Sequence, residues 1–305
     1  MIVVSGEALI DLVIQPDGSL RAVPGGGPFN TARTIGRLGV AAAFLGRLSR
    51  DRFGGFLRGA LIDDSVDVSM AEPTDAPTTL AMAELDDEGI ATYRFHTAET
   101  ASPELSHEAV VTALATRPAA FHLGTLGLVL EPIAAALEAG MATADEATVV
   151  MLDPNCRPLV IRDRAAHLAR IRRVAARADI VKVSTDDLDW LEPGQESVAA
   201  AQALLKRGPR VVLITDGPGD ARIVTRDEVV AVPVLRVGVV DTVGAGDAFG
   251  GGFLARWIER GLGRADLDNR AALRDAVEFA VEVAALTCQR TGADPPRRAE
   301  LASLR

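Results

Sequence analysis

The chain contains few of the residues that build disulfide, zinc or lysine-based phosphate sites. It has only two cysteines, Cys156 and Cys288, which lie far apart, and four histidines without ligand spacing. A disulfide framework and a zinc cluster are therefore excluded. Its only lysines are Lys182 and Lys206, and neither follows a glycine, so a Walker A phosphate loop is excluded as well.

The chain also lacks long apolar runs and an excess of basic residues. No apolar run reaches the roughly 18 residues that span a bilayer, and the first residues form a strand pattern without a basic leader. The formal net charge is −10 and the pI is about 5.0. Nucleic acid and anionic membranes are therefore not expected partners, and we expect a soluble, cytoplasmic protein.

Hydrophobic residues, by contrast, make up 48% of the chain, which is enough for the core of a single domain over residues 1–305. From about residue 105, predicted strands at 119–123, 148–152, 179–183 and 211–214 alternate with predicted helices. This order predicts an α/β fold with a doubly wound, mostly parallel sheet flanked by helices. Ligands of such sheets bind beyond the carboxyl ends of the strands.

Two early hairpins stand outside this alternation. Their strands fall within residues 12–24 and 78–96, with turns at Pro16 and at residues 86–89. We predict that the hairpins form a small β-sheet lid over the main domain. The alternative is that they are edge strands of the main sheet.

The chain is organised around residues 241–247, which read D-T-V-G-A-G-D. An apolar run at 237–240 predicts a buried strand before them, and 248–258 predicts a helix after them. Small residues at such a turn let a ligand approach the backbone, and a helix N-terminus attracts an anion. Asp247, on the first helical turn, is placed to take a proton from an attacking hydroxyl. The alternative is a Gly-rich turn with Asp247 as an ordinary helix-start residue.

This stretch is not a dinucleotide-binding fingerprint. The pattern G-x-G-x-x-G requires glycine at position 249, which is Phe249. An anion pocket that contains a carboxylate and no lysine indicates phosphoryl transfer to an alcohol, with aspartate as the base.

Three features in this order resemble the ribokinase-like (PfkB) carbohydrate kinase family. They are Asp11 after the first strand, a loop of three glycines at 25–27 with Asn30, and the stretch at 241–247. That stretch matches the family motif D-T-x-G-A-G-D without departure, and the resemblance covers the whole chain. It implies a ribokinase-like fold with a β-lid, ATP as the phosphoryl donor and Mg²⁺ as a cofactor.

The resemblance also implies roles for individual residues. Asp247 is the expected catalytic base, and the backbone of Gly244, Ala245 and Gly246 is expected to hold the transferring phosphoryl group. The expected sugar ligands are Asp247, Asp11, Gly26, Gly27, Asn30 and Arg94, the last beside Tyr93 near the end of the lid. For Asn30 the alternative is a helix N-cap, and for Asp11 and Arg94 it is a place on the surface.

On the nucleotide side, the resemblance points to a further set of residues. They are Lys182, Ser184, Thr215, Gly217 and Gly219, with Arg157 of the D-P-N-x-R stretch at 153–157 as a phosphate clamp. Ser184 and Asp187 depart from the N-x-x-E pattern of the family. Asp187 is expected to hold Mg²⁺ through water, although Ser-x-x-Asp also suits a helix capping box.

The resemblance implies a monovalent cation site too. Its expected ligands are Asp241 and the carbonyls of Val243, Thr287, Arg290 and Gly292, which makes K⁺ a further candidate cofactor.

The D-P-N-x-R stretch and the sequence Lys-Val-Ser at 182–184 are similar to the fructokinase branch, so fructose is the leading substrate. The alternatives are 2-keto-3-deoxygluconate kinase and ribokinase. A non-catalytic sugar-binding regulator is the alternative of another class. Exposed lid edges can pair between subunits, so we also expect a homodimer.

Overall fold

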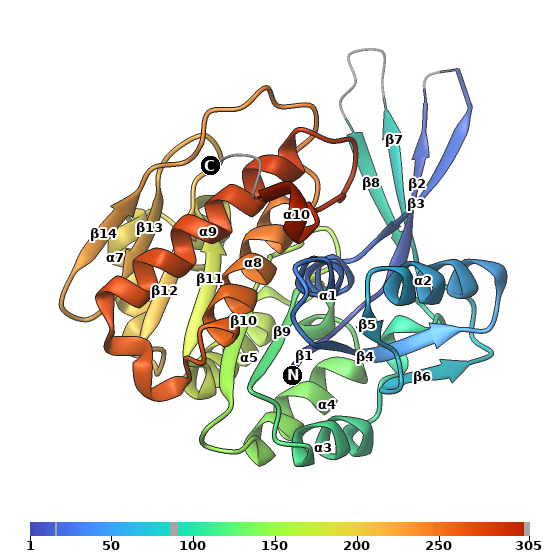
Figure 1. The fold of residues 1–305 in the computed structure, drawn as a ribbon. Coiled ribbons are helices and arrows are strands. Elements are labelled where there is room, and N and C mark those ends of the chain that lie inside the picture. Colours follow the sequence, from blue (N-terminus) through green and yellow to red (C-terminus); the bar gives the residue numbers. More distant parts are fainter. Residues whose placement is uncertain (16, 86–90, 302–305) are drawn as a thin grey trace.

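The computed structural model describes residues 1–15, 17–85 and 91–301 of the chain. Within these ranges, one sheet of ten strands has the order β14-β13-β12-β11-β10-β9-β1-β4-β5, with β6 also paired to β4 (Figure 1). Its strands are β1 (Ile2–Ser5), β4 (Ala42–Ser49), β5 (Val66–Asp67), β6 (Ala71–Thr74), β9 (Ala120–Gly124), β10 (Val149–Asp153), β11 (Ile180–Ser184), β12 (Val211–Thr215), β13 (Ala221–Val224) and β14 (Val229–Val232). The pairs are parallel except for the antiparallel hairpin β13–β14 and its pairing with β12.

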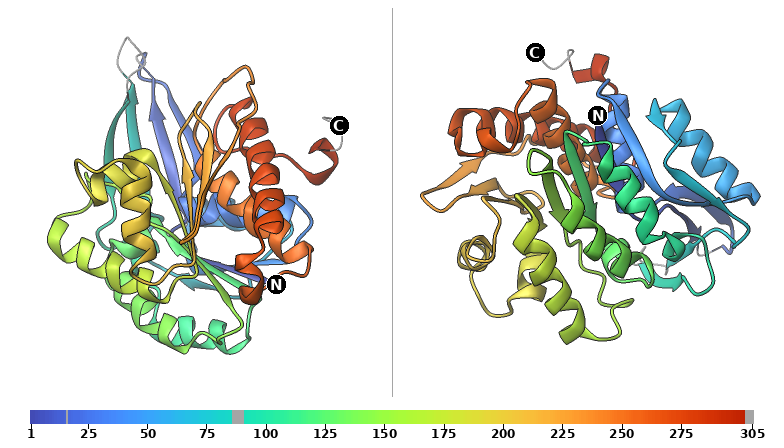
Figure 2. Two further views of the ribbon diagram at one scale, coloured as in Figure 1. Left: turned by 90° about the vertical axis from the view of Figure 1, so that its left-hand side faces the viewer. Right: turned by 90° about the horizontal axis from the view of Figure 1, so that it is seen from below.

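Helices cover both faces of this sheet, as the edge-on view in Figure 2 shows. Successive strand residues point to opposite faces, so in β1 Ile2 and Val4 enter one apolar core and Val3 enters the other. The first core is covered by α1 (Gly27–Arg37), α2 (Arg52–Asp63), α8 (Ala245–Glu259) and α9 (Arg270–Cys288). The second is covered by α3 (His107–Ala115), α4 (Ile133–Gly140), α5 (Arg164–Arg177), α6 (Thr185–Leu191) and α7 (Ser197–Leu205). The predicted doubly wound fold is confirmed.

The two predicted hairpins form a second sheet, in the order β3-β2-β7-β8. Its strands are β2 (Leu9–Ile14), β3 (Leu20–Gly25), β7 (Leu80–Leu85) and β8 (Ala91–His96), and they rise above the main sheet in Figure 1. The prediction of a small separate sheet is confirmed, and the alternative of edge strands is wrong. The predicted turn at 86–89 and Pro16 of the other turn lie outside the described residues.

The predicted buried strand at 237–240 is wrong. Residues 233–240 follow β14 as an extended segment without strand pairing, and Val239 and Val240 are each 62% exposed. The apolar run occurs here because Val237 and Val239 line a cleft instead of the core of the sheet.

The structure adds short elements that the sequence pattern did not indicate. They include the 3₁₀ turn η2 (Thr125–Leu128) after β9 and the short helix α10 (Arg298–Leu301). Among the helices in the described ranges, none is both long and apolar enough to cross a membrane.

Candidate active site

A cleft of about 1300 Å³ lies between the carboxyl ends of the parallel strands and the lid sheet. Asp11, Val23 and Tyr93 line it from the lid, Lys182 from β11, and Asp247 from the start of α8. The structure therefore brings the N-terminal glycine loop and the 241–247 stretch, more than 200 residues apart in sequence, to one site.

Asp247 lies on the first turn of α8 and is only 7% exposed. Its Oδ2 accepts a hydrogen bond of 2.9 Å from Nδ2 of Asn30, and its backbone carbonyl accepts one of 3.4 Å from Oγ1 of Thr31. The N-cap of α1 is Gly26, so the N-cap alternative for Asn30 is wrong. Helix α1 thus fixes one carboxylate oxygen, while the other, Oδ1, faces the glycine loop at Gly27.

The turn before α8 has the geometry of an anion hole. Gly244 is the N-cap in a left-handed conformation with φ 78°, which L side chains rarely adopt. The amide of Ala245 donates to the carbonyl of Thr242 at 3.2 Å. Gly246 and Asp247 lie in the first helical turn, whose amides have no partner inside the helix. These amides and the helix dipole give this turn positive character toward the cleft.

Lys182 places a cation directly under this turn. A Cβ built on Gly246 would lie 2.8 Å from its Nζ, so a side chain there would displace the ammonium group. The prediction of an anion pocket without lysine is therefore wrong. The Nζ also bonds Oδ2 of Asp153 at 3.0 Å, and both side chains are buried. Burial favours the neutral amine, but the surrounding carboxylates, Asp153 first, raise the pKa of Lys182 above its ordinary value and keep it charged.

The environment of Asp247 makes its carboxylate more basic than an exposed one. Burial raises the pKa of Asp247, while the hydrogen bond from Asn30 and the charges of Lys182 and Arg157 oppose that rise. A carboxylate with a raised pKa that remains anchored in one orientation suits general-base catalysis.

Asp11 and Arg157 face each other across the sugar side of the cleft. Burial raises the pKa of Asp11 to about 6, against the charge of Arg157, and the nearby charge of Asp247 adds to the increase. A Cβ on Gly25 would lie 2.0 Å from Oδ2 of Asp11, so the glycine loop leaves space for this carboxylate.

Glu7 was not identified from the sequence, although it lines the same cleft. It is 2% exposed and accepts hydrogen bonds from the amide of Gly27 at 3.1 Å, the amide of Gly127 at 3.1 Å and the hydroxyl of Thr125. Burial raises its pKa to about 7. This carboxylate joins the glycine loop to η2 and therefore helps to fix the position of the glycine loop on the sugar side of the cleft.

Asn155 was also missed as a separate site residue. It lines the cleft, and its Nδ2 lies 3.5 Å from a Cβ built on Gly27. Its φ of 37° is unusual for a residue other than glycine. Such local strain often occurs at functional positions, and the D-P-N-x-R stretch was the only sequence signal for it.

Arg94 is not placed as predicted. Tyr93 and Phe95 line the cleft, and the alternation of side chains along β8 sends Arg94 to the other face of the lid. There its side chain is 64% exposed, and its Nε pairs with Glu84 at 3.2 Å. Tyr93, its neighbour, is the lid residue that faces the site.

Ser184 and Asp187 form the capping box of α6, as the structural alternative predicted. Oδ2 of Asp187 accepts from the hydroxyl of Ser184 at 2.7 Å, and Oδ1 accepts from the amide of Cys156 at 2.7 Å. Both carboxylate oxygens are therefore engaged by protein donors. Asp187 ties α6 to the D-P-N-x-R loop.

The nucleotide loop after β12 is partly as expected. Thr215 and Gly217 line the cleft, and Gly217 has a positive φ of 50°. Gly219 is not among the lining residues, and its amide donates to the carbonyl of Asp216 at 2.7 Å. It closes the turn instead of facing the cleft, so the prediction that Gly219 contacts the nucleotide does not match its placement.

Three of the predicted cation ligands, Asp241, Val243 and Gly292, lie together behind the anion hole. Asp241 accepts from the amides of Val243 at 3.0 Å and Gly292 at 2.8 Å, and the amide of Arg290 donates to the carbonyl of Thr287 at 3.1 Å. In the described part of the chain, no group of three or more His, Cys, Asp or Glu side chains could hold a metal ion. A cation at this place would therefore depend on backbone oxygens and Asp241.

Comparisons with known proteins agree with this geometry. The family model described as "pfkB family carbohydrate kinase" matches residues 1–299. A fructokinase of Rhizobium leguminosarum bv. trifolii is 39% identical over 84% of this chain and 79% of its own length. The fructokinase of Xylella fastidiosa, solved with bound ATP, has 30% identity and a TM-score of 0.92, with 99% of this chain and 97% of that chain covered.

A third similar protein is the fructokinase of Vibrio cholerae O395, solved with fructose, ADP and calcium ion. It has 28% identity and a TM-score of 0.87, with 99% of this chain and 97% of that chain covered. A double mutant of that enzyme was solved with fructose, ADP and potassium ion.

A doubly wound sheet with a β-lid and a carboxylate at a helix N-terminus defines a ribokinase-like sugar kinase. With a family model that covers almost its whole length, this chain belongs to the pfkB family of carbohydrate kinases.

Proposed function

We propose that the protein is an ATP-dependent kinase that phosphorylates a hydroxyl of fructose, and that residues 1–305 act as one kinase domain. The observation that carries this proposal is the carboxylate of Asp247, held by Asn30 at 2.9 Å beside an anion hole with Lys182 beneath it. The fructokinase relatives and the neighbour solved with fructose and ADP support the choice of sugar. 2-Keto-3-deoxygluconate and ribose are the alternative substrates.

The site performs this reaction with few groups. Asp11 and Asn30 orient the sugar, and the free oxygen of Asp247 accepts the proton of the attacking hydroxyl as the bond to phosphorus forms. The first-turn amides of α8 and the charge of Lys182 stabilise the negative charge on the transferring group. Arg157 lines the same cleft and is the proposed phosphate clamp.

We propose Mg²⁺ as the metal cofactor. It would be held chiefly by nucleotide phosphates and water, near Asp187 and the exposed Asp186 at the edge of the cleft, because Mg²⁺ usually keeps several waters. K⁺ is the proposed monovalent ion behind the anion hole, beside Asp241 and the backbone of Val243 and Gly292. We further propose a homodimer formed through the lid edges, and a cytoplasmic location.

The first prediction tests the reaction itself. The purified protein should release ADP when fructose, ATP and Mg²⁺ are all present, and less with ribose, 2-keto-3-deoxygluconate or no sugar. Asp247→Asn should lower kcat by about 10³-fold or more, because the base and its charge are lost together. Sugar binding without ADP release by the wild type would favour the non-catalytic regulator, and near-normal turnover by the variant would exclude Asp247 as the base.

A further inference from the structure

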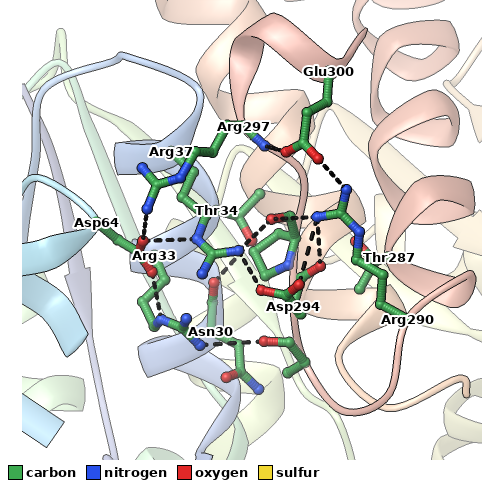
Figure 3. Close-up of polar contacts among 12 residues, drawn as sticks. Asn30, Arg33, Thr34, Arg37, Asp64, Thr287, Arg290, Asp294, Arg297 and Glu300 are labelled. Carbon is green, nitrogen blue, oxygen red and sulfur yellow. Dashed lines mark hydrogen bonds and ion pairs between the residues drawn. The ribbon is translucent and has the colours of Figure 1, made fainter. Parts of the chain in front are cut away.

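A cluster of ion pairs lies outside the cleft, one to two turns along α1 from Asn30, which bonds Asp247. Asp64, only 3% exposed at the end of α2, pairs with Nε of Arg33 at 2.7 Å, Nε of Arg37 at 2.8 Å and Nη2 of Arg297 at 3.0 Å (Figure 3). Arg33 and Arg37 come from α1, whereas Arg297 comes from residues 289–300, which we call the strap. One buried carboxylate therefore joins α1, α2 and the strap.

The strap touches the anion hole directly. The amide of Gly292 donates to Oδ2 of Asp241 at 2.8 Å. Ala293 packs so closely on Gly244 that a Cβ added to the glycine would lie 2.5 Å from that of Ala293. Nη1 of Arg33 also donates to the carbonyl of Ala293 at 3.2 Å. The backbone that sets the left-handed turn at Gly244 is thus supported from behind by the strap.

The strap is itself held at several points. Arg37 bonds both the Asp294 side chain and the carbonyl of Pro295, and Arg290 pairs with Glu300 within the strap (Figure 3). Removing the charge of Asp64 would leave three guanidinium groups without their shared anion, two of them largely buried. Such a change loosens the strap without touching the cleft.

We propose that Asp64 is a positioning residue for phosphoryl transfer, which acts through the strap on the anion hole at 241–247. This inference rests on the proposed function. The strap contacts the phosphoryl side of the cleft and not the sugar ligands. Replacement of Asp64 should therefore change kcat much more than the KM for fructose.

The experiment compares Asp64→Asn and Arg297→Ala with the wild type. The first should lower kcat about tenfold and the second about threefold, with the fructose KM within about twofold. Hydrogen exchange of the ligand-free protein, read by mass spectrometry, should be faster at residues 241–247 in both variants. Arg297 is 55% exposed, so its variant tests the proposal even if the other does not fold.

The matched control is Arg256→Gln. Arg256 is covered to a similar degree as Arg33 and Arg37, with 15% exposure, and its Nε lies 2.7 Å from Oδ2 of Asp275, which is 41% exposed, but it lies near the other end of α8 from the anion hole. It should lower the melting temperature without selective exchange at 241–247. The proposal would be overturned if Asp64→Asn and Arg297→Ala both left kcat and the exchange at residues 241–247 unchanged. It would also be overturned if their exchange changes were no more confined to residues 241–247 than those of the control. A wild type inactive on fructose would instead defeat the proposed function. The two outcomes can be told apart because the hydrogen exchange result does not depend on turnover.

Discussion

Glu7 is the buried group whose ionisation bears most directly on the sugar side of the cleft. As an anion it accepts three hydrogen bonds, from Gly27, Gly127 and Thr125. Only a carboxylate supplies acceptors to all three donors at once. Its high pKa shows that burial opposes this charged state. Glu7 therefore holds the loop at some energetic cost, as is common at functional sites.

Glu7→Gln should raise the fructose KM about tenfold at pH 8. The NH₂ group of glutamine would face at least one of the three groups that now donate to the carboxylate, and that hydrogen bond would be lost. The KM for ATP should stay within about twofold. In the wild type the fructose KM should rise as the pH falls from 8 to 6, because a carboxylate with a pKa of about 7 gains its proton over that range. In the variant this rise should be smaller.

The control for that prediction is Asp179→Asn. Asp179 is also buried and accepts from the amide of Val150 at 2.9 Å, but it lies at the opposite end of the sheet strands. It should reduce stability and leave the fructose KM unchanged. Equal KM values for wild type and Glu7→Gln across the pH range would show that the loop does not need the charge.

Single residues were predictable where the chemistry was written in a local motif. Asp247 and Asn30 lie together as the resemblance implied, because each belongs to a motif at a helix start. Glu7 was missed because one glutamate after a strand carries no local signal, and its three donors come from distant segments. Arg94 was misplaced because the sequence did not fix which face of the lid strand it occupies.

At the scale of elements, the turn between residue 241 and α8 is the part that allows least change. Gly244 has φ 78° and packs against Ala293, so a side chain there meets both backbone strain and a neighbouring methyl group. The turn must also keep the first-turn amides directed at the cleft. Glycine here meets a conformational and a steric requirement at once.

Gly244→Ala should lower kcat by about tenfold to hundredfold, since a displacement of about 1 Å at an oriented catalytic group costs that much. The matched control is Gly55→Ala on α2, away from the cleft, because a Cβ there has no heavy atom within 4 Å and the backbone φ is not positive. Steady-state kinetics of both variants would test this. Equal kcat values would mean that the turn tolerates a side chain and that its geometry is not what limits the reaction.

The helices and most strands follow from hydrophobic periodicity, which is a local property. The segment at 237–240 shows where that reasoning fails. Four apolar or small residues predict a buried strand, yet two of them, Val237 and Val239, line a cleft in which a ligand would cover them. Sequence pattern records that a residue is covered, but not whether protein or substrate covers it.

At the scale of the whole molecule, the cleft lies between two separate sheets. The main sheet supplies Lys182 and the helix turn with Asp247, while the lid sheet supplies Asp11 and Tyr93. The alternation of strands and helices predicted the main sheet, and the two early hairpins predicted the lid, but the relative placement of the two sheets depends on long-range packing that no local pattern encodes. A sugar bound between them would add contacts from both sides.

Bound sugar and nucleotide should therefore both stabilise the fold. Asp247→Asn permits the measurement with ATP itself, since turnover is blocked. Each ligand at 100 times its own Kd adds about 2.7 kcal/mol, or about 5.4 kcal/mol together. With about 2 cal/mol/K of unfolding entropy per residue over 305 residues, the melting temperature should rise by about 9 °C.

Differential scanning calorimetry would measure this shift, with a sugar that the wild type does not phosphorylate as the control ligand. A shift larger than the two single-ligand shifts combined would mean that each ligand orders the cleft for the other, since the ordering cost is then met only once. If fructose stabilised the protein no more than the control sugar, the cleft between the two sheets would not be its binding site. The arrangement of lid and helix turn would then have to serve a different acceptor.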